Sequence, residues 1–381
     1  MKLIPYSRQS INFKDINVVK KVLKSSIITT GKEVEKFEKK INSYLKCKHS
    51  TVCNSGTSAI YLALNAIGLK HNENIIMPAI NFVASHNISR NLGANIFLAD
   101  VNVNTGQMSP EDVEECIKKF RIKKIKAVLT MYNGGYPSNI EKFQYLKKKY
   151  KCFIIEDACH AFGAKYKFKN KILKVGSCKH SDISTFSLHP LKTITTGEGG
   201  IVTTNSKVFN DRIKKIRTLG ISRNKKKHWE YDVVYSGLNL RLNDFQCALG
   251  SSQLSRISSF IKLRKKIANK YNNALKDIDE INLPKHNSKY MTSYHLYLIN
   301  FKKPNLKKKE RLIKYMLQNR ILVQYHYIPL NKFKIFKGKY ITKNAKIYYK
   351  STLSLPIYPD LSLKDQNYII GKLKLFFKLD E

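Results

Sequence analysis

Short apolar runs alternate with helical patterns through the first 205 residues of the chain. Runs typical of buried strands cover residues 50–53, 74–77, 95–99, 127–131, 152–156, 183–188 and 201–204. Apolar residues at helical spacing occupy residues 15–25, 33–44, 59–67, 83–92, 110–120 and 140–150. This alternation predicts an α/β fold, in which helices cover a mainly parallel sheet.

The pattern changes after about residue 250. A long helical pattern at 251–275 is followed by a strand-like run at 294–301, a helical pattern at 308–319, a second strand-like run at 321–327 and a closing helix at 363–377. A chain of 381 residues also exceeds the usual size of one small core. We therefore expect a large domain at 1–250, whose first 30 residues pack near a smaller α+β C-terminal domain at 251–381.

The composition is ordinary for a globular protein, with 43% hydrophobic and 25% charged residues. No apolar run approaches the length of a membrane helix, and the N-terminus lacks the apolar core of a signal peptide. The seven cysteines are odd in number and form no CxxC pair, which favours free, mostly buried thiols in a reducing compartment. We therefore expect a cytoplasmic protein.

The net charge of +43 is the one unusual bulk property. A basic surface attracts phosphate chains, so nucleic-acid binding is one interpretation. The excess is mostly lysine spread along the whole chain, with short runs such as Lys147–Lys149, Lys225–Lys227 and Lys307–Lys309 and no nucleic-acid-binding motif. The charge indicates a lysine-biased composition, which still helps to draw in an anionic substrate.

The densest polar stretch between two strand-like runs contains a single lysine, Lys192. Hydroxyl side chains and three glycines surround it, whereas lysines elsewhere in the chain occur in clusters. A buried lysine with a lowered pKa forms a Schiff base with an aldehyde and then moves a proton as a base. Ser187, five residues earlier, is placed to hold a phosphate oxygen, and the glycines allow a tight return into the next strand.

Two further polar groups follow strand ends. Residues 54–58 (NSGTS) place small hydroxyl residues at a helix start, which suits either an anion or an ordinary helix cap. Asp157 ends the run CFIIED, where it either contacts a ligand or caps the next helix. His160, three residues on, either touches the same ligand or is structural, and Cys159 provides bulk rather than a nucleophile.

Together with GLNLRLNDFQCALG at residues 237–250, these segments resemble the nucleotide-sugar aminotransferases, which are fold-type I pyridoxal-phosphate enzymes. The resemblance extends from Pro5 through HYIP at 326–329 and SLPIYP at 354–359, so it covers nearly the whole chain. The family has Phe in the position of Leu188, an apolar exchange that leaves the lysine unaffected. The resemblance implies a large domain with a seven-stranded type of sheet, mainly parallel, and pyridoxal 5′-phosphate as cofactor without a metal.

The resemblance also implies roles for individual residues. Lys192 is the Schiff-base and proton-transfer residue, Asp157 pairs with the pyridine nitrogen, and His160 borders the ring near its hydroxyl. Phe82 stacks on the open face of the ring. The phosphate is held by Thr57, Ser58, Ser187 and, from the partner subunit of a homodimer, Asn239. The candidates for the sugar-nucleotide side are Tyr6, Arg241, His326 and Tyr327.

The implied reaction is transamination, with L-glutamate as amino donor and a UDP-linked 4-keto-6-deoxy sugar as acceptor. Within the family, the segments IPYSRQSI and LSLPIYP are similar to the branch that makes the 4-amino group of the pseudaminic acid precursor. Another keto-sugar, of perosamine, bacillosamine or legionaminic type, is an alternative acceptor. A related sugar dehydratase would replace Lys192 by histidine, and a basic, non-catalytic binding protein would lose the lysine or add a nucleic-acid-binding segment; neither feature is present.

Overall fold

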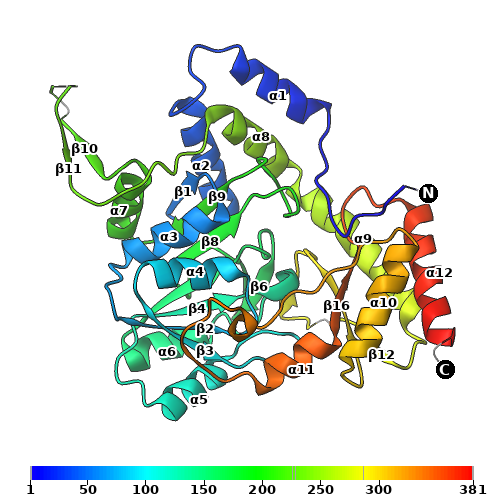
Figure 1. Ribbon diagram of the computed structural model, residues 1–381. Coiled ribbons are helices and arrows are strands. Elements are labelled where there is room, and N and C mark those ends of the chain that lie inside the picture. The colour runs from blue at the N-terminus through cyan, green and yellow to red at the C-terminus, as the bar shows by residue number, and fades with distance from the viewer. Residues whose placement is uncertain (1, 225, 228, 286, 380–381) are drawn as a thin grey trace.

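In the computed structural model, described for residues 2–224, 226–227, 229–285 and 287–379, one large sheet runs through the molecule (Figure 1). Its eight strands, in spatial order, are β1 (His49–Cys53), β9 (Gly200–Thr204), β8 (Ile183–Ser187), β5 (Phe153–Asp157), β4 (Ala127–Met131), β2 (Asn74–Pro78), β3 (Asn95–Ala99) and β15 (Lys339–Tyr340). β9 is antiparallel to both neighbours, and the other neighbouring pairs are parallel. The predicted α/β fold is confirmed, and the two-residue β15 extends the expected seven strands.

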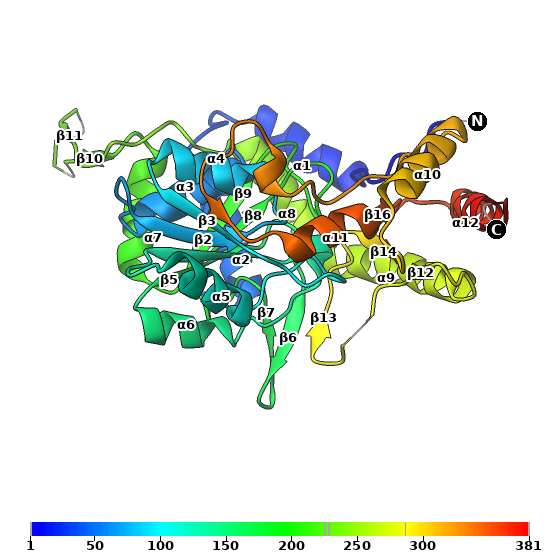
Figure 2. The ribbon, with the colours of Figure 1, turned by 60° about the horizontal axis from the view of Figure 1, so that its bottom comes forward.

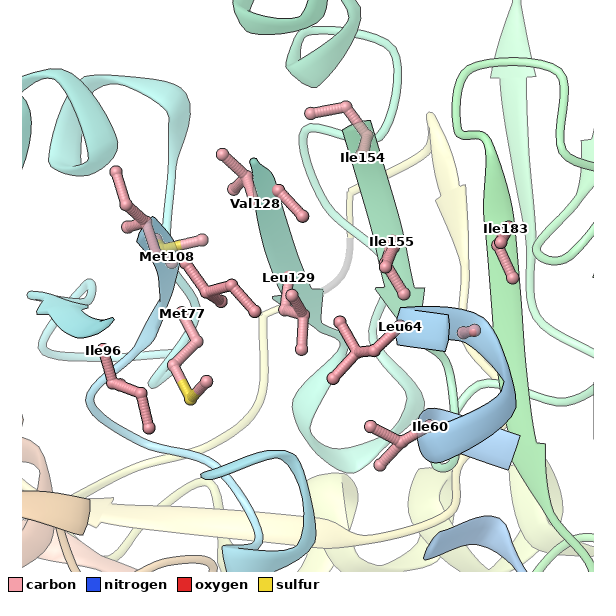
Figure 3. Packing of buried hydrophobic residues seen from close by; sticks show 14 of the residues in the cluster. Ile60, Leu64, Met77, Ile96, Met108, Val128, Leu129, Ile154, Ile155 and Ile183 are labelled. Carbon is pink, nitrogen blue, oxygen red and sulfur yellow. The ribbon is translucent and has the colours of Figure 1, made fainter. Parts of the chain in front are cut away.

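Helices cover both faces of this sheet. They are α2 (Lys32–Leu45), α3 (Gly56–Ala66), α4 (Val83–Asn91), α5 (Pro110–Phe120), α6 (Phe143–Tyr150) and α7 (Lys207–Arg217). Figure 2 shows α3 and α4 on one side of the sheet and α5 and α6 on the other. In the core, α3 turns Ile60 and Leu64 toward the strands that carry Leu129 and Ile155 (Figure 3). This buried face fixes the position of the N-terminus of α3 relative to the strand ends.

The C-terminal part has its own antiparallel sheet of β12 (Ile281–Asn282), β14 (Tyr297–Phe301) and β16 (Thr352–Leu355). Its helices are α9 (Ile257–Leu275), α10 (Leu306–Gln318), α11 (Lys343–Ser351) and α12 (Leu363–Leu379). A second hydrophobic cluster joins this sheet with α9, α10 and α12, and Ile4 from the N-terminal segment belongs to it. Ala345 and Tyr348 of α11 belong instead to the core of the large sheet. Ile4 also bridges Ile321 in parallel, so the first residues lie against this part of the chain.

Three sequence-based element predictions are wrong in detail. The predicted helix 251–275 is two helices, α8 (Asp244–Ser255) and α9, which separate at Arg256, where the guanidinium turns to Asp15 of α1 (Phe13–Leu23). Residues 321–327 form only isolated bridges, at Ile321 and Gln324, and no strand. The carbonyl of His326 accepts a hydrogen bond from the side-chain amide of Asn133, so it does not pair with a neighbouring strand. α6 begins at Phe143 rather than at residue 140, because residues 140–142 form turns after Asn139, whose φ is +53°.

Smaller elements complete the fold. A second small sheet contains β6 (Lys165–Phe168), β7 (Lys171–Lys174) and β13 (Tyr290–Met291). The hairpin of β10 (Ile221–Arg223) and β11 (Tyr231–Val233) projects away from the body (Figure 1). The single-turn 3₁₀ helices are η1 (Asn133–Gly135) and η2 (Leu330–Lys332).

The expectations for the cysteines and for membrane-spanning helices can be compared with the described residues. All seven cysteines are free and six are buried, which confirms the expectation for the thiols. Across the described ranges, no helix has both the length and the apolar character needed to cross a bilayer. Residue 225, in the lysine run Lys225–Lys227, lies outside the described residues.

Candidate active site

The carboxyl ends of three strands meet at one edge of the large sheet. Cys53 of β1 and Ser187 of β8 both lie opposite Gly200, and Asp157 of β5 lies opposite Thr185. A cavity of about 540 Å³ opens at this edge, where ligands gather in α/β sheets. Nine predicted site residues line it: Tyr6, Thr57, Phe82, Asp157, His160, Ser187, Lys192, His326 and Tyr327.

Lys192 lies in the turn between β8 and β9, and its side chain faces the cavity. Leu188 closes the base of the turn: its N–H donates to Gly199 (2.8 Å) and its carbonyl accepts from the Thr196 N–H (3.0 Å). Gly197, with a φ of +82°, reverses the chain within it. Burial lowers the pKa of the Lys192 ammonium, and the nearby Cys159 and Asp157 offset only part of this effect. Burial therefore raises the share of the neutral amine, the form that acts as nucleophile and base.

Asp157 is buried at the end of β5, with 3% of its surface exposed. Its Oδ2 accepts a hydrogen bond from Ser85 Oγ at 2.9 Å, and its Oδ1 accepts from the backbone N–H of Cys159 at 3.3 Å. Ser85 lies on the buried face of α4, so this helix fixes the carboxylate. These two donors orient the carboxylate, which suits a side chain that faces a cationic ring nitrogen.

His160 is buried in the wall of the cavity, and its two ring nitrogens have different partners. Nδ1 accepts the backbone N–H of Gly134 at 3.3 Å, and Nε2 lies 2.8 Å from Tyr327 Oη. Burial, with Lys192, His295 and His326 nearby, holds the pKa of His160 well below its ordinary value. The imidazole is therefore neutral at physiological pH.

The N-terminus of α3 forms a second wall, next to the end of β8. Ser55 caps the helix by accepting the Ser58 N–H at 3.0 Å. A Cβ on Gly56 would lie 2.8 Å from Ser187 Cβ, so the close approach of helix and strand depends on this glycine. The first N–H groups of a helix have no intrahelical partner and carry the positive end of its dipole. Thr57 and Ser187 line the cavity beside them, which makes an anion cradle.

Three predicted residues lie outside this cavity. Ser58 turns away from it, and its hydroxyl donates to Asn54 Oδ1 at 2.6 Å. Asn239 and Arg241 lie on the segment that follows the projecting β10–β11 hairpin. The Asn239 side chain is exposed, while Leu240 between the two residues is buried.

Phe82 occupies the N-cap of α4 and is 52% exposed although it lines the cavity. Its ring lies 5.7 Å from that of Tyr327, measured between centroids. An exposed aromatic face beside a cavity that also contains a lysine and a carboxylate is suited to stacking on a planar ligand. The sequence-based placement of Phe82 in the site therefore agrees with its position.

Sequence reasoning missed several contributors to this site. His295 lines the cavity with its ring centroid 4.2 Å from that of His160, and Ser85 holds Asp157 from outside the cavity. Glu198 stands at the rim, 3.9 Å from His189. Only Glu198 had a usable sequence signal, its place in the lysine turn. Ser85 on a helix face and His295 before a strand have no sequence pattern that distinguishes them from ordinary buried residues.

Comparison with known proteins agrees with this geometry. The sequence model of the DegT/DnrJ/EryC1/StrS aminotransferase family matches residues 9–374. The chain is 35% identical over 370 residues to the UDP-4-amino-4,6-dideoxy-N-acetyl-beta-L-altrosamine transaminase of Campylobacter jejuni subsp. jejuni serotype O:23/36 (strain 81-176), with 96% of both chains covered.

Two solved structures share the fold along almost the full length of the chain. One is the Helicobacter pylori aminotransferase PseC, involved in the biosynthesis of pseudoaminic acid, with a TM-score of 0.91 and 29% identity over 99% of this chain and 100% of that one. The other is the PLP form of the putative sugar aminotransferase Spr1654 of Streptococcus pneumoniae, with a TM-score of 0.89 and 25% identity over 99% of both chains.

Proposed function

The chain belongs to the DegT/DnrJ/EryC1/StrS aminotransferase family, and we propose that it moves an amino group from L-glutamate to the 4-keto carbon of a UDP-linked 4-keto-6-deoxy sugar, a precursor of pseudaminic acid. That the protein is a sugar aminotransferase follows from the family. The choice of sugar is supported by the altrosamine transaminase name of the Campylobacter relative and by the pathway of the Helicobacter structure.

Enzymes of this family use pyridoxal phosphate, and the cavity fits this cofactor at three separate points. The Gly56–Ser187 approach and the N-terminus of α3 provide a cradle for the phosphate. Asp157, held by two donors, suits the pyridine nitrogen, and the exposed ring of Phe82 suits the face of the pyridine. When bound, the cofactor supplies a protonated ring that withdraws electrons from the carbon that loses its proton.

In this arrangement, Lys192 Nζ is the group that moves the proton. The neutral amine takes a proton from Cα of the amino donor and later returns one to C4 of the sugar, so the same atom serves both halves of the reaction. The lowered pKa of Lys192 raises the share of amine that is free to accept that proton. The carboxylate of Asp157 is the charged acceptor that keeps the ring nitrogen protonated meanwhile.

The sugar side of the cavity is lined by groups that are neutral at physiological pH. Burial lowers the pKa of His326 to about 3 and raises the pKa values of Tyr6 and Tyr327, so all three offer uncharged hydrogen-bonding groups. Such groups suit the hydroxyl and keto oxygens of a sugar. The net charge of +43 suits the anionic diphosphate that carries the sugar.

The active assembly that we propose is a homodimer in a reducing cytoplasm. Because side chains alternate in extended backbone and Leu240 is buried, Asn239 and Arg241 project from the opposite side of the segment. They are therefore available to a neighbouring subunit, Asn239 for the cofactor phosphate and Arg241 for the sugar nucleotide. We further propose residues 1–250 and 251–381 as the large and small domains, supported by the separate core that joins α9, α10, α12 and the C-terminal antiparallel sheet. Buried free thiols are compatible with the reducing location.

The observation that carries the function is that Lys192, Asp157 and the anion cradle line one cavity. The test is the visible absorbance of purified protein loaded with pyridoxal phosphate. We expect a band that glutamate removes, that a UDP-linked 4-keto-6-deoxy-N-acetyl-altrosamine restores, and that a GDP-linked keto-sugar does not. Lys192→Ala should not form the band. Restoration by the GDP-linked sugar alone would assign a different acceptor, and absence of the band in the loaded wild type would contradict the aminotransferase mechanism.

A further inference from the structure

The three-residue turn η1 (Asn133–Gly135) contacts three of the four histidine-bearing segments that line the cavity, those of His160, His295 and His326. Asn133 Nδ2 donates to the carbonyl of His326 at 3.0 Å. The N–H of Gly134 donates to Nδ1 of His160 at 3.3 Å. The carbonyls of Gly134 and Gly135 accept the N–H groups of Leu296 (3.1 Å) and Ser293 (3.0 Å), which flank His295. One turn thus holds three wall segments that lie far apart in the sequence.

The two glycines of this turn are required by its conformation and its surroundings. Gly134 and Gly135 have φ angles of +71° and +81°, which side-chain-bearing residues rarely adopt. A Cβ on Gly135 would also overlap Ser293 Oγ and the carbonyl of His160. The turn therefore packs closely against the segments that carry His160 and His295.

The contact of Gly134 with His160 determines where the imidazole carries its hydrogen. A neutral imidazole has one N–H, and the other nitrogen is an acceptor. Because Nδ1 accepts the Gly134 N–H, the hydrogen resides on Nε2, which then donates to Tyr327 Oη at 2.8 Å. The hydroxyl hydrogen of Tyr327 is thereby directed to a different acceptor, and Tyr327 lines the cavity. Burial raises the pKa of Tyr327 well above its ordinary value of 10.0, so the phenol keeps this hydrogen.

Asn133 fixes the other end of the same arrangement. Its amide and the hydroxyl of Tyr348 both donate to the His326 carbonyl, at 3.0 and 3.1 Å, and the amide also donates to Tyr348 Oη at 2.7 Å. Asn133 and Tyr348 are fully enclosed by protein, so water does not compete for these bonds. Because the His326 carbonyl immediately precedes Tyr327, this clamp sets the direction of the Tyr327 side chain.

We propose that Asn133 is a positioning residue that aims Tyr327, and that the Tyr327 hydroxyl donates a hydrogen bond to an oxygen of the ligand in the cavity. This inference rests on the proposed function. The acceptor is an electron-rich oxygen next to the reacting atoms. It is either the keto oxygen of the sugar or the phenolic oxygen of pyridoxal phosphate.

Other ionisable groups near this pair belong to the same wall. Lys192, His295 and His326 lie close enough to His160 to lower its pKa together with burial, and Asp157 and Tyr6 act on Tyr327. A pH titration of the loaded enzyme therefore reports all of these groups together. The assignment to Tyr327 comes from comparing variants under identical conditions.

The test compares Tyr327→Phe and Asn133→Asp with Asn300→Asp in the loaded protein. Asp has the size of Asn but lacks the amide donor. Asn300 is a matched control, because its buried amide also donates to a backbone carbonyl, that of Asn104 at 3.0 Å, and it lies on β14 away from the cavity. Two quantities are measured: the pH midpoint of the cofactor absorbance without substrates, and KM for the UDP-linked keto-sugar beside the rate of the glutamate half-reaction.

If the cofactor oxygen is the acceptor, we expect Tyr327→Phe and Asn133→Asp to shift the absorbance midpoint upward, by about tenfold in proton affinity, as loss of one hydrogen bond predicts. If the sugar oxygen is the acceptor, we expect KM for the keto-sugar to rise about tenfold while the glutamate half-reaction is unchanged. Asn300→Asp should move neither quantity.

Three outcomes would overturn the proposal: Tyr327→Phe moves neither quantity, Asn133→Asp does not follow Tyr327→Phe, or Asn300→Asp shifts both to the same extent. Tyr348→Phe removes one donor to the His326 carbonyl and one acceptor of the Asn133 amide, but the amide still donates to that carbonyl. It should therefore give a smaller shift in the same direction, and it serves if Asn133→Asp does not fold. A wild-type protein without the cofactor band would contradict the proposed function itself, which separates that failure from a failure of the Tyr327 assignment.

Discussion

Ser85 Oγ donates a 2.9 Å hydrogen bond to Asp157 Oδ2 across 72 residues of sequence. The serine is completely buried on α4, and the aspartate closes β5 at the floor of the cavity. The helix that begins with Phe82 at the open face of the cavity therefore also orients the carboxylate. A change in α4 therefore affects two sides of the cavity, the Asp157 carboxylate and the exposed Phe82 ring.

Ser85→Ala should reduce kcat about tenfold and weaken pyridoxal phosphate binding, since a hydrogen bond to a carboxylate contributes roughly 1.5–3 kcal/mol. Ser85→Thr keeps the hydroxyl and should retain most of the activity. Ser89→Ala is the control, because Ser89 is equally buried one turn further along α4 but bonds only to the Ser85 carbonyl, at 2.8 Å. Steady-state kinetics and cofactor titration check this. Equal kcat losses in the Ser85 and Ser89 variants would attribute the effect to helix stability alone.

Gly56→Ala should destabilise the protein by about 1–3 kcal/mol, because the new Cβ would lie 2.8 Å from Ser187 Cβ and must push α3 away from β8. The same displacement opens the phosphate cradle, so the affinity for pyridoxal phosphate should fall as well. Gly371→Ala on α12 is the matched control. Apart from its own helix turn, nothing in the described part of the chain lies within 4 Å of its added Cβ, and the substitution should stabilise by roughly 0.5–1 kcal/mol through helix propensity. Thermal unfolding with and without cofactor measures both effects; a neutral Gly56→Ala would be inconsistent with the close approach.

Lys192→Met should stabilise the cofactor-free protein near neutral pH, by about 1 kcal/mol, since burying an ammonium group without a full set of partners is costly. Burial lowers the pKa of Lys192 from 10.5, so the unfolded chain holds this proton more tightly. Wild-type stability therefore rises with pH between the lowered folded pKa and 10.5, and the advantage of the variant should shrink across that window. Urea unfolding at a series of pH values tests the sign. An advantage that grows with pH would be incompatible with a lowered pKa.

The fold could be predicted from the sequence because strands and helices depend on local patterns, whereas the role of Lys192 as the reacting group stays a prediction. Alternating apolar runs predicted the strands that form the main sheet, and the lysine turn identified Lys192 by its unusual setting. Prediction from the sequence fails where tertiary contacts override the local preference for a helix or strand. Residues 321–327 have the apolar pattern of a strand, but Asn133 takes the His326 carbonyl that a ladder would need.

The supporting residues of the site were beyond sequence reasoning for the same physical reason. Ser85 and Asn133 act through side chains that meet partners 72 and 193 residues away. Nothing in the sequence around either residue differs from an ordinary buried serine or a turn asparagine. Such roles follow from the three-dimensional pairing of segments rather than from any periodicity.

Mixing inactive chains tests whether Asn239 serves the neighbouring subunit. If one site combines Lys192 of one chain with Asn239 of the other, a hybrid of Lys192→Ala and Asn239→Ala chains has one site with both changes and one intact site. With random pairing, about half of the dimers are hybrids, so activity should recover to about a quarter of wild type. If Asn239 acted within its own chain, both sites of the hybrid would be defective.

The control replaces the Asn239→Ala chain by a chain that carries both changes, which leaves no intact site in any pairing and should give no recovery. Asn239 is well placed for this exchange, because its exposed side chain lies outside the cavity of its own chain. The measurement is activity after unfolding and refolding the chains together, with subunit exchange verified by a tag on one chain. No recovery despite verified hybrids would place Asn239 outside the neighbouring site and leave the phosphate to Thr57, Ser187 and the N-terminus of α3.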